Sequence, residues 1–174
     1  MMNFQKKGFT LVETLVAITI LVISIVGPLY AVHRAIVASY TARDSLAATA
    51  LAQEGAEFVR STRDSNYLSN QSDWLYGLST CMVTGAQGPS DYGCGPDISS
   101  GSLEACGSSG CTPLRLDTSY RYRQGGSGTP TRFARRVTIS NVSPTEVEVI
   151  VQVTWSTLRI PYTVTVTEHL YNWQ

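Results

Sequence analysis

The feature that most limits how this chain can fold is an uncharged stretch near its start. From Thr14 to Val32, nineteen consecutive residues carry no charge, and most of them are apolar. As a helix this stretch spans about 28 Å at about 1.5 Å per residue, which is close to the hydrocarbon thickness of a bilayer. We therefore predict a membrane-spanning helix, kinked at Gly27 and Pro28 because proline removes a backbone donor.

The residues around this stretch predict its orientation. Lys6 and Lys7 come shortly before it, so the N-terminus is expected in the cytoplasm and the rest of the chain outside. A cleaved secretory signal peptide, a plain signal anchor and a buried helix of a soluble protein are alternatives. The stretch is longer than a usual signal-peptide core, and the nearest small-x-small site lies beyond it at 48–50. It is also long for a buried helix.

A carboxylate lies at the start of this apolar helix, at Glu13. Such a charge costs about 2–3 kcal/mol at the bilayer centre and less near its edge. Thr10, three residues earlier, completes the pattern of a helix capping box, which explains the spacing of the two residues. The capping box does not explain why Lys-Lys-Gly stands immediately before Phe9.

The segment at 6–17 reads Lys-Lys-Gly-Phe-Thr-Leu-Val-Glu-Thr-Leu-Val-Ala, and it resembles the class III signal sequence of type IV pilins and type II secretion pseudopilins. The resemblance implies that prepilin peptidase cuts between Gly8 and Phe9 and methylates the new amine of Phe9. It also implies that Glu13, the fifth mature residue, pairs with the N-terminal amine of a neighbouring subunit during filament assembly. A glycine suits a narrow peptidase site because it has no β-carbon.

The resemblance implies an α+β fold, the pilin-like lollipop, in which a long bent N-terminal helix, half of it transmembrane, packs on an antiparallel β-sheet head. The pattern after Pro28 agrees with a continuing helix of about 55 residues in total, ending near 63–67. Apolar residues recur there at the spacings of an amphipathic helix: Leu29, Val32, Ile36, Tyr40, Ala47, Leu51 and Phe58.

The middle of the chain has a different composition. Residues 66–114 hold four acids and no basic residue, and eleven of the fourteen glycines lie in 77–128. This composition predicts a loop-rich variable region, with a short strand near 78–82. Its acids Asp91, Asp97 and Glu104 suggest calcium, as in some pseudopilins, but the spacing is not that of an EF-hand and solvated acids are the simpler interpretation. No metal or cofactor is predicted.

All four cysteines, Cys81, Cys94, Cys106 and Cys111, lie in this region. Zinc ribbons use Cys-x2-Cys pairs, and the chain has none. Outside the cytoplasm an even number of cysteines favours disulfides. Four cysteines allow three connectivities, and local closure favours Cys81–Cys94 with Cys106–Cys111.

From 112 onward, apolar residues alternate with polar ones, as in strands with one buried face. The clearest strands are 147–155 and 162–168, preceded by 133–139, with turns at 141–144 and 158–161. We predict an antiparallel meander whose apolar face receives the helix. Six arginines of this part are expected to meet the acidic loop or a neighbouring subunit: Arg115, Arg121, Arg123, Arg132, Arg135 and Arg136.

The predicted organisation has five parts: a cleaved leader (1–8), a transmembrane and filament-core half of the helix (9–32), an amphipathic half (33–65), the variable region (66–130) and the sheet (131–174). The formal net charge is zero, so no nucleic-acid partner is expected. His169 has no nucleophile motif or second histidine beside it, and no enzymatic activity is predicted.

The predicted function is that of a structural subunit, a minor pilin or pseudopilin, of a type IV pilus or type II secretion-like filament. The expected partners are prepilin peptidase, other pilin or pseudopilin subunits, the inner-membrane assembly platform and the cytoplasmic membrane. The chain would cross the inner membrane once, with its head exported, and then enter a periplasmic or extracellular filament. The alternative is a single-pass, membrane-anchored extracellular binding or enzymatic domain with no filament role.

Overall fold

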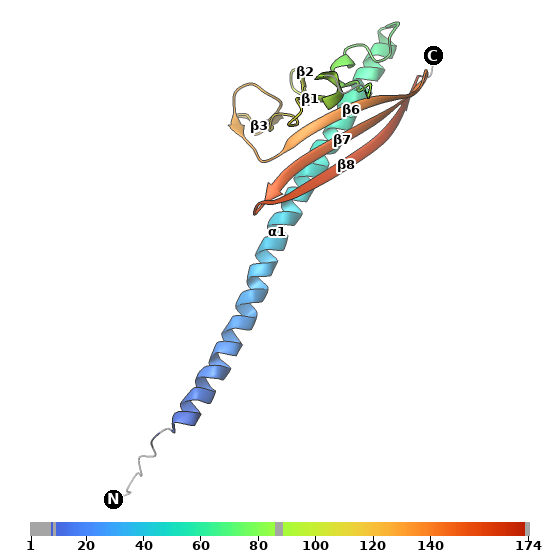
Figure 1. Ribbon diagram of the computed structural model, residues 1–174. Helices are drawn as coiled ribbons and strands as arrows, with labels where there is room; N and C mark the ends of the chain where they lie inside the picture. The colour runs from blue at the N-terminus through green and yellow to red at the C-terminus, as the bar shows by residue number, and fades with distance from the viewer. Residues whose placement is uncertain (1–7, 9, 86–88, 173–174) are drawn as a thin grey trace, which may run out of the picture. The chain divides into compact units, whose positions relative to one another are not determined.

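A computed structural model describes residues 8, 10–85 and 89–172 of the chain (Figure 1). The chain forms two compact units, residues 1–42 and residues 43–174, and we call the second unit the head. The elements in chain order are α1 (Leu11–Leu68), η1 (Ser79–Cys81), η2 (Pro89–Tyr92), β1 (Cys94–Asp97), β2 (Ser102–Ala105), β3 (Arg115–Leu116), β4 (Tyr122–Arg123), β5 (Thr129–Pro130), β6 (Ala134–Ser143), β7 (Glu146–Thr157) and β8 (Ile160–Tyr171).

Helix α1 has 58 residues and runs through Gly27 and Pro28 without interruption. It ends at Leu68, one residue beyond the predicted segment, and the kink at Gly27 and Pro28 stays a prediction. Three hydroxyls in its apolar part donate to backbone carbonyls one turn earlier: Thr14 to Leu11, Thr19 to Leu15 and Ser24 to Ile20. Such bonds satisfy these hydroxyls within the helix, as an apolar environment requires.

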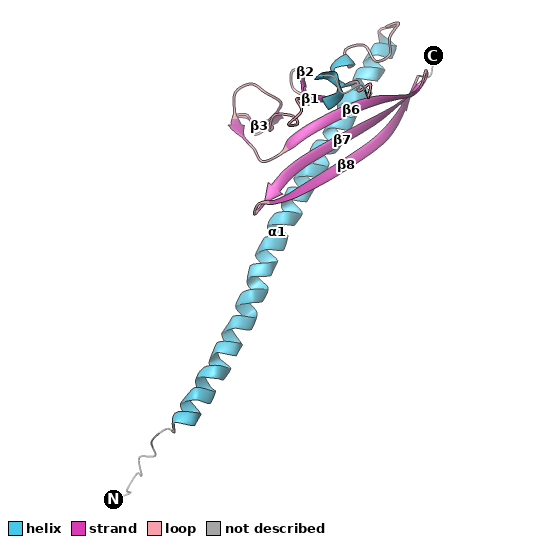
Figure 2. Ribbon diagram, viewed as in Figure 1, coloured by secondary structure: helices cyan, strands magenta, loops and turns pink. Residues whose placement is uncertain are grey.

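The head is built on a five-stranded antiparallel sheet in the order β2-β1-β6-β7-β8. Strands β6, β7 and β8 form the predicted meander and lie side by side along the second half of α1 (Figure 2). Side chains of β6 and β7 alternate between buried and partly exposed over most of their length. The buried set includes Val137, Ile139, Val149, Val151 and Val153. A small second sheet has the order β4-β3-β5.

Small residues line the face of α1 that packs on this sheet. The buried residues of the helix include Ala48, Ala52, Gly55 and Ala56; Ala52 follows Ala48 by four positions, and Gly55 and Ala56 follow Ala52 by three and four. A β-carbon added at Gly55 would lie 2.9 Å from Cγ1 of Val151 and 3.1 Å from Cδ of Arg135. The helix therefore approaches the sheet so closely at Gly55 that a larger residue there must push against the side chains of Val151 and Arg135.

The prediction of a long apolar helix packed on an antiparallel sheet is confirmed. The strand expected near 78–82 was wrong, because this segment forms the short helix η1. Leu78 and Cys81 are both fully buried, and their spacing of three places them on one face of a helical turn. Only Met82 pairs with the sheet, through an isolated bridge to Ile139.

We expect Gly55→Val to destabilise the head by about 1–3 kcal/mol, because the added methyl groups overpack the contact with Val151. Thermal unfolding of the full-length protein in detergent, followed by circular dichroism, measures this loss. Gly107→Val is the matched control, since a β-carbon there meets nothing within 4 Å. Equal transition temperatures for the two variants would contradict a tight approach at Gly55.

Candidate functional site

The start of α1 is held by a threonine cap. The backbone N–H of Glu13 donates to Oγ1 of Thr10 over 3.2 Å, and the N–H of Thr14 donates to the carbonyl of Thr10 over 3.2 Å. The Thr10 hydroxyl therefore satisfies the Glu13 N–H, which has no intrahelical partner in the first turn, and the Thr10 carbonyl accepts the first i to i−4 bond of the helix. The side chain of Glu13 is exposed, and within the described part of the chain it forms no ion pair.

Gly8 lies just before this cap and is exposed. A β-carbon added at Gly8 meets no atom within 4 Å, so packing against the described residues does not require a glycine there. Phe9, the residue predicted to carry the new amine, lies outside the described residues, as do Lys6 and Lys7. The predicted cleavage and methylation at Gly8 and Phe9 therefore stay predictions.

The first half of α1 exposes apolar side chains around its whole circumference. The helix contains a window that is long and apolar enough to cross a membrane, and none of that window is buried. Its exposed apolar residues include Leu11, Leu15, Ile18, Leu21, Val22, Ile25 and Leu29. Water-soluble monomers rarely expose contiguous apolar surfaces of this extent. Such a surface suits contact with lipid or with other apolar helices.

A scan against protein-family models matched residues 3–27 to the prokaryotic N-terminal methylation motif. The N-terminal methylation motif marks the type IV pilin and pseudopilin family, and here it covers residues 3–27 of the 174-residue chain. No curated protein and no solved structure matches the chain. The matched segment contains Lys6, Lys7, Gly8, Glu13 and the apolar residues up to Gly27.

The pilin-like fold and the methylation motif together make this a prepilin-like protein. Pilins are typically structural proteins rather than enzymes. The motif implies processing by prepilin peptidase and pilin assembly. Together with the apolar helix, it also indicates membrane anchoring and export of the head.

Two disulfides hold the loop region of this prepilin-like chain. Cys81 joins Cys94, which ties η1 to β1, and Cys106 joins Cys111. This is the connectivity that local closure favours. Cys81 and Cys94 are fully buried and belong to the main core cluster, whereas Cys106 and Cys111 close a short loop after β2.

The three loop acids proposed for calcium, Asp91, Asp97 and Glu104, are engaged with donors of the chain itself. Asp91 accepts hydrogen bonds from Thr84, Asp97 from Ser99 and Arg123, and Glu104 from Thr112 and Gln124. In the described ranges no three His, Cys, Asp or Glu residues are grouped as a metal site. Burial raises the pKa of Asp97, but hydrogen bonds from Arg123 and Ser99 outweigh it, so this pKa lies below its usual range.

The six arginines are used mainly inside the head. Arg123 pairs with Asp97 of the acidic loop region 66–114. Contact with this region was one of the two roles predicted for the arginines; the other was contact with a neighbouring subunit. Arg135 is fully buried and donates to Glu54 and to the carbonyls of Leu51 and Pro96. Burial lowers the pKa of the Arg135 guanidinium, while the hydrogen bond and charge of Glu54 oppose this shift. Arg135 thus joins α1, β1 and β6.

Asp44 is a buried carboxylate near the start of the part of α1 that belongs to the head, and its burial could not be recognised from the sequence. Asp44 is 8% exposed and accepts hydrogen bonds of 2.8 Å from Arg132 and from Oγ1 of Thr157. A charged residue in an amphipathic helix such as this one is expected on its exposed face. The partners of Asp44 are 88 and 113 residues away in the chain, so no local signal identifies them.

We expect replacement of Cys81 and Cys94 by alanine to cost more stability than replacement of Cys106 and Cys111. A disulfide typically contributes about 2–4 kcal/mol, and the contribution grows with the length of the closed loop. The sequence separations are 13 and 5, which corresponds to a difference of about 1 kcal/mol. Loss of the buried pair from the core adds to this difference. Urea unfolding of the two full-length double variants measures it, and a costlier loss of Cys106–Cys111 would contradict this ranking.

Proposed function

We propose that the chain is a structural subunit, a minor pilin or pseudopilin, of a type IV pilus or type II secretion-like filament. One observation carries the proposal: the methylation motif stands directly before a helix whose first half is apolar and exposed and whose second half packs on a folded head. An exposed apolar helix fits lipid before assembly and the helices of other subunits afterwards. A soluble domain on a plain anchor needs no methylation motif.

In this proposal prepilin peptidase cuts between Gly8 and Phe9 and methylates Phe9. Cleavage removes Lys6 and Lys7, which are the only lysines of the chain, and thereby the charges that hold the N-terminus in the cytoplasm. It also creates a cationic amine four residues before Glu13. The exposed position of Gly8 suits access by a peptidase.

Glu13 sets the register between subunits in this proposal. A carboxylate in an apolar seam is costly when it is alone, and a cationic amine at close range offsets the cost. The cap of α1 uses the Thr10 hydroxyl and the backbone N–H of Glu13. No ion pair within the described residues engages the Glu13 carboxylate, which leaves it available for the Phe9 amine of a neighbouring subunit.

The proposed location is the inner membrane, with the N-terminus in the cytoplasm and the head outside, followed by a periplasmic or extracellular filament. The two disulfides of the head support this orientation, because disulfides persist in oxidising compartments. The proposed partners are prepilin peptidase, other pilin or pseudopilin subunits and the inner-membrane assembly platform.

We expect Gly8→Asp to leave an uncut precursor when the chain is co-expressed with prepilin peptidase. The aspartate side chain is expected to block the peptidase site. A β-carbon at position 8 meets no described atom within 4 Å, so we expect folding of the head to be unaffected. Immunoblotting for the size shift measures processing. Gly107→Asp, at another uncrowded glycine, serves as the control and is cut normally. A Gly8→Asp chain of normal mature length would place the cleavage site elsewhere.

We expect Glu13→Ala to be processed normally but to enter filaments about tenfold less, which corresponds to about 1.4 kcal/mol. The reason is the loss of the carboxylate that pairs with the neighbouring amine. Sheared filaments, quantified against the membrane fraction, measure incorporation. Glu57→Ala removes an exposed glutamate of the same helix and is expected to assemble like the unaltered chain. Equal incorporation of both variants would exclude the register role of Glu13.

A further inference from the structure

The head carries an exposed apolar projection at one end of β8 and an apolar pocket at the other. Strand β8 has 12 residues, which span about 36 Å at about 3.3 Å per residue. The projection is the turn from Leu158 to Ile160, where β8 begins. The pocket lies where β8 ends, beside Tyr171 and Asn172.

The projection places apolar side chains in solvent on an unfavourable backbone. Leu158 has φ of 52° and Arg159 has φ of 67°, and two-residue hairpin turns of this kind normally use Asn and Gly. A non-glycine residue in the left-handed region costs about 1–3 kcal/mol. Leu158 is 72% exposed and Ile160 55% exposed, so packing within the head does not account for this choice of residues.

The base of the projection is fixed to α1. Thr157, the last residue of β7, donates to the buried carboxylate of Asp44, which also accepts from Arg132. Because both bonds are 2.8 Å long and Asp44 is buried, the turn is held in one position on the head. A projection ordered in this way can dock without a large entropic cost.

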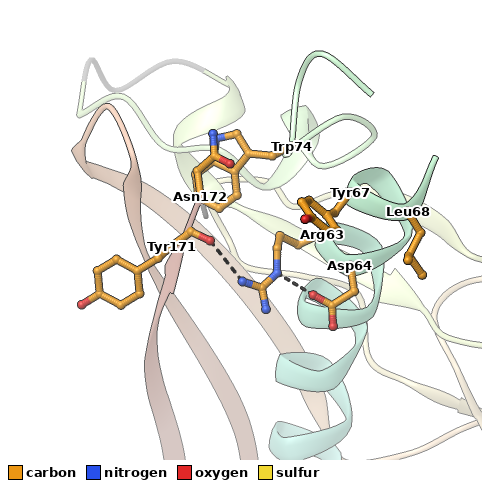
Figure 3. A pocket seen from close by; sticks show the side chains of 7 residues that line it. All are labelled: Arg63, Asp64, Tyr67, Leu68, Trp74, Tyr171 and Asn172. Atoms are coloured by element: carbon orange, nitrogen blue, oxygen red, sulfur yellow. Dashed lines mark hydrogen bonds and ion pairs between the residues drawn. The ribbon is translucent and has the colours of Figure 1, made fainter. Parts of the chain in front are cut away.

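The pocket at the other end is small and mostly apolar. Its volume is about 220 Å³, and it is lined by Arg63, Asp64, Tyr67, Leu68, Trp74, Tyr171 and Asn172. Figure 3 shows the Arg63 guanidinium between the carbonyl of Tyr171, 3.1 Å away, and the carboxylate of Asp64, 2.7 Å away. The ion pair with Asp64 leaves that carboxylate 55% exposed.

The size of the pocket fits a side chain better than a metabolite. An apolar cavity of about 150 Å³ holds a benzene ring, so about 220 Å³ admits a leucine or isoleucine. Pockets for drug-sized ligands are larger, about 300–1,000 Å³. Asp64 and Asp73 are exposed and residues 66–114 contain no basic residue. Even with Arg63 paired to Asp64, these charges leave the surroundings negative, which favours a cationic neighbour.

We propose that the Leu158–Ile160 turn of one copy docks in this pocket of a second copy, with Leu158 in the cavity and Arg159 facing Asp64. The proposal rests on the proposed filament function and adds a contact between heads to the contact between helices. The two surfaces differ and lie at opposite ends of β8, so the contact is heterologous. Each copy bound in this way still offers a free turn or pocket to another, which is how open filaments grow.

Cysteine cross-linking in the full-length chain tests this contact. The native cysteines are all in disulfides, so Leu158→Cys and Leu68→Cys introduce the only free thiols. Leu68 lines the pocket and is 80% exposed. Mild oxidation of membranes and sheared filaments is expected to yield a ladder of dimers, trimers and larger species. The control pair, Thr165→Cys with Leu68→Cys, uses an exposed residue in the middle of β8 and should yield no ladder.

A charge reversal sharpens the test. Arg159→Glu in the Leu158→Cys, Leu68→Cys background is expected to lower the ladder about tenfold, and adding Asp64→Arg is expected to restore it. No ladder, an equal ladder from the control pair, or a ladder unaffected by Arg159→Glu would overturn the proposal. If the double-cysteine chain is cleaved and enters filaments but forms no ladder, only this contact is overturned. An unprocessed wild-type chain overturns the proposed function itself.

Discussion

The close contact between the second half of α1 and the inner face of β6 and β7 is the interaction on which the head depends. It is made by small residues on the helix, with Gly55 at the point of closest approach, and by valines on the strands. Arg135 crosses the same interface and binds the helix through Glu54 and the carbonyl of Leu51. The Arg135 side chain is fully buried but that of Glu54 is 41% exposed, so loss of Glu54 is expected to cost less than the roughly 3–5 kcal/mol typical of a wholly buried pair.

Before Arg43, the same helix is suited to an apolar environment rather than to packing on a sheet. Its apolar side chains are exposed there, and its hydroxyls are satisfied by the helix's own carbonyls. One continuous helix therefore joins a surface that needs an apolar environment to a surface that completes a folded core. In the proposed filament, Glu13 and the turn at Leu158 make separate contacts between subunits.

The sequence predicted those parts of the fold that have a local pattern. The uncharged stretch predicted the first half of α1, and the alternation predicted β6, β7 and β8. That alternation also placed Arg135 on the same face as Val137 and Ile139, although a basic residue there suggested a surface role. Strand β1 was missed because Gly95 and Pro96 disfavour a strand, yet the Cys81–Cys94 disulfide and pairing with β2 hold it in the sheet.

Features that depend on distant residues could not be predicted. The Asp44–Arg132–Thr157 cluster joins three separate parts of the chain, and the pocket beside Arg63 joins the end of α1 to the end of β8. Gly55 has an ordinary sequence context, and only the distance to Val151 shows why a glycine stands there. Gly8 is the opposite case: no contact within the described chain explains it, and only its place in the methylation motif suggests a role.

The central claim is that this chain is a processed filament subunit rather than an anchored domain. Intact-mass and peptide mass spectrometry of the protein purified from membranes that contain prepilin peptidase tests this claim most directly. We expect a mature chain that begins with N-methylated Phe9 and lacks residues 1–8. A chain that retains Met1 and residues 2–8, with no methylated form, would contradict it.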